Sequence, residues 1–276
     1  MKRLKSVFDF YINSSIHVAI AVFSMTYVSL LEFNLPTDWS LLFFVFFSTI
    51  TGYNFVKYFG IAKFHHRSLA GWLRVIQVFS FVCFLLMIWF AFQLQLETLV
   101  YIVVFGMVTF LYAIPFLPKR FFMDQQKNLR NIGGLKVYVI GLVWGGVTVL
   151  LPILDTNEPF DMDVWLTAIQ RFILVMILML PFEIRDLQYD SLKLATIPQK
   201  IGTKNTKIMG VVLGIVFLLL EFLKAELTQK IILLTFAVTF VTLLFVVFAN
   251  KKRSSYYSSF WVESVPIGWL ILHLVF

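Results

Sequence analysis

The chain has 276 residues, of which 60% are hydrophobic and only 14% are charged, and its formal net charge is +8. Soluble domains are about 45–50% apolar and about 25% charged, so this composition excludes a soluble globular enzyme and a disordered tail. The one cysteine, Cys83, cannot form an intrachain disulfide, which excludes a disulfide scaffold. The composition therefore predicts a protein that crosses a membrane several times.

Nine segments are long and apolar enough to cross a membrane as helices. A spanning helix needs about 20 mostly apolar residues, and the seventh segment is the shortest of the set. The pattern therefore predicts an all-α polytopic bundle of nine transmembrane helices. In chain order the segments are residues 12–31, 39–59, 72–92, 98–116, 137–154, 165–182, 208–222, 231–248 and 260–276.

The basic residues are concentrated on one side of this predicted bundle. The segments on the N-terminal side of the membrane carry 20 of the 23 lysines and arginines. Lysine and arginine favour cytoplasmic loops, so we expect a cytoplasmic N-terminus and an external C-terminus. Because every basic cluster then has an orientation role, nucleic acid is not expected as a partner. The basic segments are residues 1–11, 57–74, 117–136, 183–207 and 249–259.

The predicted cytoplasmic segment at residues 183–202 carries two aspartates that could form a site. Asp186 and Asp190 are four residues apart, so they share one face if the sixth helix continues through them. Paired carboxylates can hold Mg²⁺, which prefers oxygen ligands and often bridges to phosphate oxygens. Lys193 nearby suits an anionic ligand. The alternative is an amphipathic surface helix in which the aspartates pair with Arg185 and Lys193.

The order of residues in this segment resembles the second aspartate motif of the UbiA superfamily of intramembrane aromatic prenyltransferases. The shared pattern is Arg-Asp-x-x-x-Asp, then a lysine, then Thr-x-Pro-x-x-x-Gly. A second segment, Leu-Tyr-Ala-Ile-Pro with a lysine and an arginine after it, is similar to a segment that follows the family's fourth helix. Nine helices with a cytoplasmic N-terminus also match the family, so the resemblance covers residues 1–276 as a single domain. The matching residues are Arg185, Asp186, Asp190, Lys193, Thr196, Pro198 and Gly202, with Tyr112, Pro115, Lys119 and Arg120.

The family's first aspartate motif, Asn-Asp-x-x-Asp-x-x-x-Asp, is not retained at the end of the second predicted helix. Aligned on Asn54, its three aspartate positions hold Phe55, Tyr58 and Ala62, and Lys57 lies among them. In the family, the two motifs together hold Mg²⁺ on an isoprenoid diphosphate and help the diphosphate leave, so that an allylic carbocation can react with an aromatic ring. Such catalysis depends on neutralising the charge of the leaving group. With one motif lost, a full set of bridged metal ions is not expected.

Lys57 suggests a second way to complete the site. Asn54, Lys57 and Tyr58 lie at positions i, i+3 and i+4, so they share a helix face. Our hypothesis is that Lys57 points into the same polar pocket as Asp186 and Asp190, where it pairs with the aspartates or contacts the diphosphate directly. The alternative is that Lys57 extends its charge to the membrane interface. Further charge at the mouth of the pocket is expected from Arg67, Lys119 and Arg120.

Two charged residues lie inside predicted spans. Arg171 belongs to the sixth segment and Glu263 to the ninth. A charge within a span usually faces the bundle interior or a cavity. We therefore expect Arg171 to form a structural ion pair with an acidic residue such as Glu263.

The sequence favours two functions for a pocket ringed by the second, fourth and sixth helices on the cytoplasmic side. The first is a divergent prenyltransferase of a bacterial inner or plasma membrane, which moves a polyprenyl group from an isoprenoid diphosphate to an apolar aromatic acceptor. Asp186 and Asp190 would be its catalytic residues and Mg²⁺ ligands. The second is a non-catalytic relative that binds a lipid, a quinone-like molecule or a protein partner. The residues expected to bind diphosphate or substrate are Asn54, Lys57, Tyr58, Arg67, Tyr112, Lys119, Arg120 and Lys193.

Overall fold

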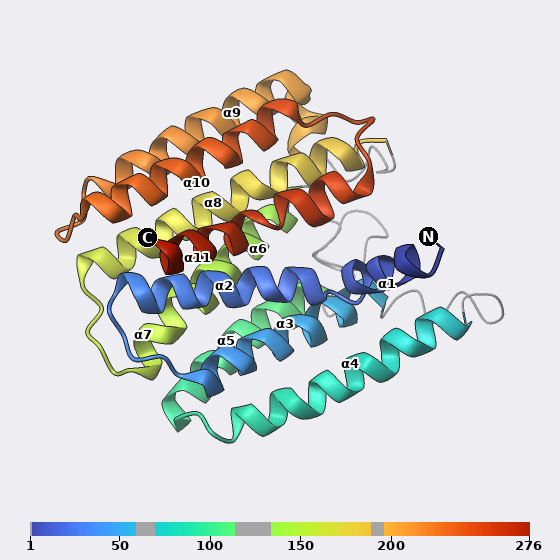
Figure 1. Ribbon diagram of the computed structural model, residues 1–276, viewed down its shortest axis with the longest axis horizontal. Helices are drawn as coiled ribbons and strands as arrows, with labels where there is room; N and C mark the ends of the chain where they lie inside the picture. The colour runs from blue at the N-terminus through green and yellow to red at the C-terminus, as the bar shows by residue number, and fades with distance from the viewer. Residues whose placement is uncertain (1, 59–69, 114–133, 189–195) are drawn as a thin grey trace, which may run out of the picture.

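The computed structural model describes residues 2–58, 70–113, 134–188 and 196–276, and these ranges are helical apart from short turns. Figure 1 shows the long helices side by side, with the N-terminus and the C-terminus at opposite ends of the bundle. The first six elements are α1 (Lys2–Asn13), α2 (Ile16–Glu32), α3 (Trp39–Tyr58), α4 (Ala70–Ala91), α5 (Leu96–Ala113) and α6 (Leu135–Gly145). They are followed by the π-helical turn η4 (Gly146–Leu150), α7 (Leu151–Asp155), α8 (Met162–Asp186), α9 (Ile197–Glu221), α10 (Gln229–Phe248), the π-helical turn η6 (Tyr257–Val262) and α11 (Val265–Val275).

The described helices confirm a polytopic membrane bundle. Seven spans are long and apolar enough to cross a membrane, and the pair α1 and α2, bent by 54°, makes an eighth if it is counted as one span. Helix α5 contributes a shorter apolar stretch, Leu96–Phe110. Each of the nine predicted segments therefore coincides with a described helix or with contiguous helices. The protein is an integral, multi-pass membrane protein.

The seventh predicted segment is wrong in its length. The prediction gives the shortest span, over residues 208–222, whereas the structure has the 25-residue element α9, which begins at Ile197. Its first turns carry lysines and so lack the apolar signal of a span, and they join the rest of α9 across a kink at Gly202 (φ 79°, ψ 160°). Glu183 Oε2 accepts a hydrogen bond from the backbone N–H of Ile197 (3.1 Å), and Pro198 lies in the first turn, where its missing N–H costs nothing.

The sixth predicted helix is wrong in its continuation past Asp186. Helix α8 ends at that residue, and a turn follows at residues 187–188. Because α8 and α9 are packed neighbours joined by a short connection, the chain must leave α8 in order to turn back. Asp190 lies outside the described residues, so the predicted shared face of the two aspartates stays a prediction.

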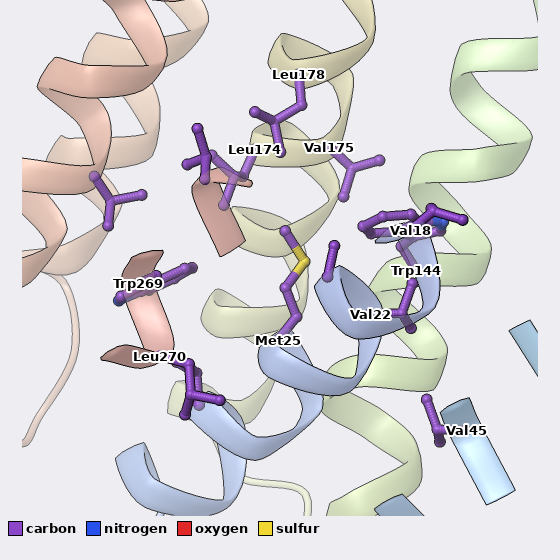
Figure 2. Packing of buried hydrophobic residues seen from close by; sticks show 14 of the residues in the cluster. Val18, Val22, Met25, Val45, Trp144, Leu174, Val175, Leu178, Trp269 and Leu270 are labelled. Atoms are coloured by element: carbon purple, nitrogen blue, oxygen red, sulfur yellow. The ribbon is translucent and has the colours of Figure 1, made fainter. Parts of the chain in front are cut away.

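An apolar core fills the middle of the bundle and separates its two ends. Figure 2 shows Met25 of α2, Leu174 of α8 and Trp269 of α11 in the same buried cluster, with Trp144 of α6 at its edge. The outer surface is apolar as well: Trp89 of α4 is 66% exposed. In water such a surface would be unfavourable, whereas lipid chains cover it without cost. Polar side chains that could bind a ligand therefore lie at the two ends of the bundle or are buried between its helices.

Candidate functional site

The break between α1 and α2 creates a polar joint at the end of the bundle that the charge distribution predicts to be cytoplasmic. Helix α1 ends at Asn13 and α2 begins at Ile16, with Ser14 and Ser15 between them. Ser15 has a φ of 65°, which is uncommon for a residue other than glycine. We call Asn13, Ser14 and Ser15 the α1–α2 joint.

Three residues at the C-terminal end of α3 bind this joint. Asn54 Nδ2 donates a hydrogen bond to the backbone carbonyl of Ser14 (2.9 Å), and Lys57 Nζ donates to Ser15 Oγ (2.8 Å). The Tyr58 hydroxyl donates to the last carbonyl of α1 (2.9 Å). All three side chains therefore leave α3 on the same side, which confirms the predicted shared face of Asn54, Lys57 and Tyr58.

Asn54 has a positioning role. Its side-chain oxygen accepts a hydrogen bond from Ser15 Oγ (2.8 Å), and its Nδ2 donates to Ser80 Oγ of α4 (2.7 Å) as well as to the carbonyl of Ser14. An asparagine amide has two N–H donors, so both are used. The residue is buried. Asn54 thus ties α2, α3 and α4 together and sets the place of the lysine one turn further along α3.

Lys57 finds its charge partner on the last helical segment of the chain. Its ammonium group and the carboxylate of Glu263, which follows η6, interact electrostatically. Lys57 is exposed and Glu263 is partly buried. Among the described residues, no contact ion pair joins the two groups. The Lys57 ammonium is therefore held at the joint by its hydrogen bond to Ser15 and not by a contact with Glu263.

Arg185 and Asp186, at the end of α8, form a contact ion pair. Arg185 Nε and Nη2 each lie 2.7 Å from Asp186 Oδ1. Arg185 Nη1 donates to Ser258 Oγ (2.7 Å) and Ser259 Oγ (3.2 Å) of η6. Arg185 also interacts with Glu263. Of the alternative in which the aspartates pair with Arg185 and Lys193, the contact between Asp186 and Arg185 is therefore formed, whereas Asp190 and Lys193 lie outside the described residues.

Two sets of contacts, one around Lys57 and one around Arg185, lie at this end of the bundle, and together they form a polar cluster. We call this set the cytoplasmic cluster; Figure 1 shows the ends of its helices at the N-terminal end of the bundle. The predicted direct ion pair between Lys57 and Asp186 is not formed, because each has another partner. Glu263 lies within electrostatic range of both Lys57 and Arg185, and it links the two halves. The cytoplasmic cluster consists of Ser15, Asn54, Lys57, Arg185, Asp186 and Glu263.

Several predicted site residues lie outside the described part of the chain. Tyr112 belongs to α5, but its side chain is not among those described. The remaining residues lie outside the described ranges, so the contacts that the sequence predicts for them stay predictions. They are Arg67, Lys119, Arg120, Asp190 and Lys193.

The described residues do not fit a pair of bridged Mg²⁺ ions. They contain no group of three or more acidic, histidine or cysteine side chains that could hold a metal ion. Asp186 is neutralised by Arg185 at 2.7 Å. The positions of the first motif present Phe55, Tyr58 and, beside them, the cation Lys57. Magnesium requires several oxygen ligands in nearly octahedral arrangement, and this part of the site supplies cations instead.

Arg171 is not paired with Glu263, so the partner named for it from the sequence is wrong. It lies 3.9 Å from Glu32 Oε2 and donates to Ser29 Oγ (3.0 Å), with its guanidinium over the Trp269 ring. The reason is the position of each residue along the bundle. Glu32 is the last residue of α2 and lies at the same end of the bundle as Arg171, whereas Glu263 precedes α11 at the opposite end.

Around Arg171 lies a second group of charges, which we call the external cluster. Lys224 Nζ and Glu221 Oε2 are 3.1 Å apart, and His273 Nε2 lies 3.4 Å from a carboxylate oxygen of Glu32. Gln170 donates to the same oxygen of Glu221 (2.9 Å). The external cluster consists of Glu32, Gln170, Arg171, Glu221, Lys224 and His273.

Sequence reasoning missed the roles of Ser15 and Glu263 in the cytoplasmic cluster. The signal for Glu263 was that it is a charged residue inside a span. Spacing along the chain does not show at which end of the bundle its partners lie. For Ser15 there was no signal, because the predicted span 12–31 ran through the joint.

No protein-family model matches the sequence, and no curated protein matches it significantly. Three solved structures are similar to it in fold. The apo structure of a UbiA homologue from Aeropyrum pernix K1 has a TM-score of 0.66 at 17% identity, covering 94% of this chain and 98% of that chain. A digeranylgeranylglyceryl phosphate synthase has a TM-score of 0.58 at 17% identity, with complete coverage of both chains. A UbiA homologue from Archaeoglobus fulgidus has a TM-score of 0.55 at 13% identity, covering 96% of this chain and 94% of that chain.

These similarities extend over nearly the whole length of every chain compared, so they concern the architecture of the bundle rather than one helical hairpin. They agree with the arrangement of described helices and with the resemblance seen in the second aspartate motif. The chain has the UbiA fold.

Proposed function

We propose that this protein is a UbiA-type prenyltransferase, which binds an isoprenoid diphosphate at the cytoplasmic cluster and transfers its polyprenyl group to an apolar aromatic acceptor. The observation that carries the proposal is the cluster: Lys57, Arg185 and Asp186 gather at one end of a bundle with the UbiA fold. One similar structure is that of a digeranylgeranylglyceryl phosphate synthase studied in membranes, which supports an isoprenoid substrate and a lipid setting.

The chemistry that such a cluster can support is the departure of a diphosphate. The bond between the allylic carbon and the diphosphate oxygen breaks, and its electron pair stays with the diphosphate. The resulting carbocation takes an electron pair from the aromatic ring, which then loses a proton. Cations fixed beside the leaving group lower the barrier because they stabilise the charge that builds up there. Lys57 and Arg185 are the described side chains able to do this.

The cellular setting and the metal are further parts of the proposal. A bacterial plasma or inner membrane is the expected location, with the cluster on the cytoplasmic side. Mg²⁺ with Asp186 and Asp190 as ligands stays a prediction from the resemblance, and no step above depends on it.

Transfer of a labelled prenyl group tests the proposal. Protein purified into lipid nanodiscs would be incubated with radiolabelled farnesyl or geranylgeranyl diphosphate and a panel of hydroxylated aromatic acceptors. We expect time-dependent transfer of label to an acceptor, and a strong loss of transfer in Asp186→Asn and Arg185→Gln. Glu226→Gln, on an exposed residue of the opposite end, should keep wild-type activity.

Failure to bind any of the diphosphates would refute the proposal. Binding without transfer to any acceptor would instead favour the non-catalytic alternative, in which the fold serves to hold a lipid or a quinone-like molecule.

A further inference from the structure

The cytoplasmic cluster carries fixed cations where the resemblance implies bound metal ions. In the aligned first motif, the carboxylate positions within the described chain hold Phe55 and Tyr58. Lys57 lies on the same helix face as Tyr58, and its ammonium is anchored at the α1–α2 joint. A lysine cannot ligate Mg²⁺, but it can neutralise a phosphate oxygen directly.

The Lys57 ammonium keeps hydrogen-bonding capacity. A lysine ammonium has three N–H donors, and Ser15 Oγ takes one of them at 2.8 Å. No other hydrogen bond or contact ion pair of Lys57 occurs in the described chain, and the residue is exposed. Two donors therefore remain for an incoming anion, while Ser15 and the buried Asn54 behind it hold the group in place.

Arg185 is the second cation of this site. Its guanidinium is held by Asp186 at 2.7 Å and by the hydroxyls of Ser258 and Ser259 of η6. Both cations therefore have fixed positions before a ligand binds, and within the described chain neither forms a contact ion pair with Glu263.

We propose that this site binds the donor diphosphate without magnesium, with Lys57 as its direct ligand and Arg185 as a second fixed cation. The inference rests on the proposed function and specifies how its substrate is held. Preorganised cations need no metal to assemble the site, and they are already in position when the diphosphate arrives.

The test measures binding of farnesyl diphosphate and of inorganic pyrophosphate to the purified full-length protein in nanodiscs, once in excess EDTA and once in Mg²⁺. We expect the farnesyl diphosphate dissociation constant to differ by less than about threefold between the two conditions, a change of less than about 0.7 kcal/mol. Lys57→Gln should weaken binding in EDTA by about tenfold or more, because a charge-assisted hydrogen bond is lost.

Two variants separate charge from structure. Lys57→Arg keeps a cation at the site, and it should retain binding within about threefold of wild type. Glu226→Gln removes one negative charge from an exposed position at the opposite end and should change nothing. Thermal unfolding of each variant verifies that it is folded.

The outcomes distinguish this inference from the proposed function. Binding that requires Mg²⁺ would overturn the inference and leave the prenyl-transfer proposal intact. Binding in EDTA that is unchanged in Lys57→Gln would also overturn it. If no diphosphate binds in either condition, both proposals fail. Should Lys57→Gln not fold, the comparison of wild-type binding in EDTA and in Mg²⁺ decides alone.

Discussion

The charged residues at the two ends of the bundle differ in their burial and in their contacts. At the external end, Arg171 is 1% exposed and lies among Glu32, Ser29 and the ring of Trp269. At the cytoplasmic end, Lys57 is exposed, and its ammonium donates a hydrogen bond to Ser15 Oγ. The charged groups of the external cluster contact one another and are enclosed. In the cytoplasmic cluster, the Lys57 ammonium is held by a hydrogen bond but contacts no described carboxylate.

This difference separates a structural cluster from one able to bind a ligand. The external cluster contains residues of α2, α8, α9 and α11, so it links these helices where water does not solvate the charges. An ionised group that loses its partner in such a place is strongly destabilising. The cytoplasmic cluster has its ammonium at the surface, where a ligand can reach it and where a lost partner is replaced by water.

The largest expected effect is the difference in cysteine labelling between the two ends of the bundle. A residue on one side of the membrane is either labelled by an impermeant reagent or not labelled at all. A membrane-impermeant maleimide should label Glu226→Cys on intact cells, and Lys251→Cys only after the membrane is permeabilised. The native Cys83 is 2% exposed, so it should stay silent in both cases. The reverse pattern would show that the charge distribution misplaced the N-terminus and that the cytoplasmic cluster faces outward.

Removal of the buried cation should have the largest effect on stability. Arg171→Met leaves the carboxylate of Glu32 without its guanidinium partner, and we expect the free energy of unfolding to fall by about 3–5 kcal/mol. Denaturation in mixed micelles measures the change. Arg171→Lys should lose less, because it keeps the charge but not the planar contact with Trp269. Wild-type stability of Arg171→Met would remove the structural role of the external cluster.

Ser15→Ala should have an intermediate effect. It removes the hydroxyl that donates to Asn54 and accepts from Lys57, so we expect a loss of about 1–2 kcal/mol in the same denaturation assay. Ser15→Gly is the matched control. It removes the same hydroxyl, but glycine adopts the φ of 65° freely, so its loss should be smaller. Equal losses would mean that the backbone conformation of the joint carries no strain.

The smallest change in stability is expected for Lys57→Gln. The glutamine side chain can still donate to Ser15, and the lost charge belongs to an exposed residue, so we expect a loss of less than about 1 kcal/mol. The contrast with Arg171→Met is the point of the measurement. A loss as large as that of Arg171→Met would show that Lys57 is a structural cation, and it would erase the distinction between the two clusters.

Much of the fold followed from local sequence, but the partners of the charged residues did not. The spans could be predicted because hydropathy over about 20 residues decides whether a segment prefers lipid. The shared face of Asn54, Lys57 and Tyr58 could be predicted because helix geometry alone sets it. The joint at Ser15 could not, since an apolar run with two serines reads as one continuous span.

The sequence by itself determined that this protein spans a lipid bilayer, the approximate limits of its helices and the side of the bundle that carries most of its basic residues. Only the tertiary structure decided that Arg171 meets Glu32 and that Glu263 faces Lys57 and Arg185. The physical reason is that spans such as α3 and α10 are apolar nearly all round, so periodicity does not say which face turns inward. Which helices lie side by side, and how each is rotated, depends on packing along the whole bundle, and that packing decides whether a charge is enclosed or available.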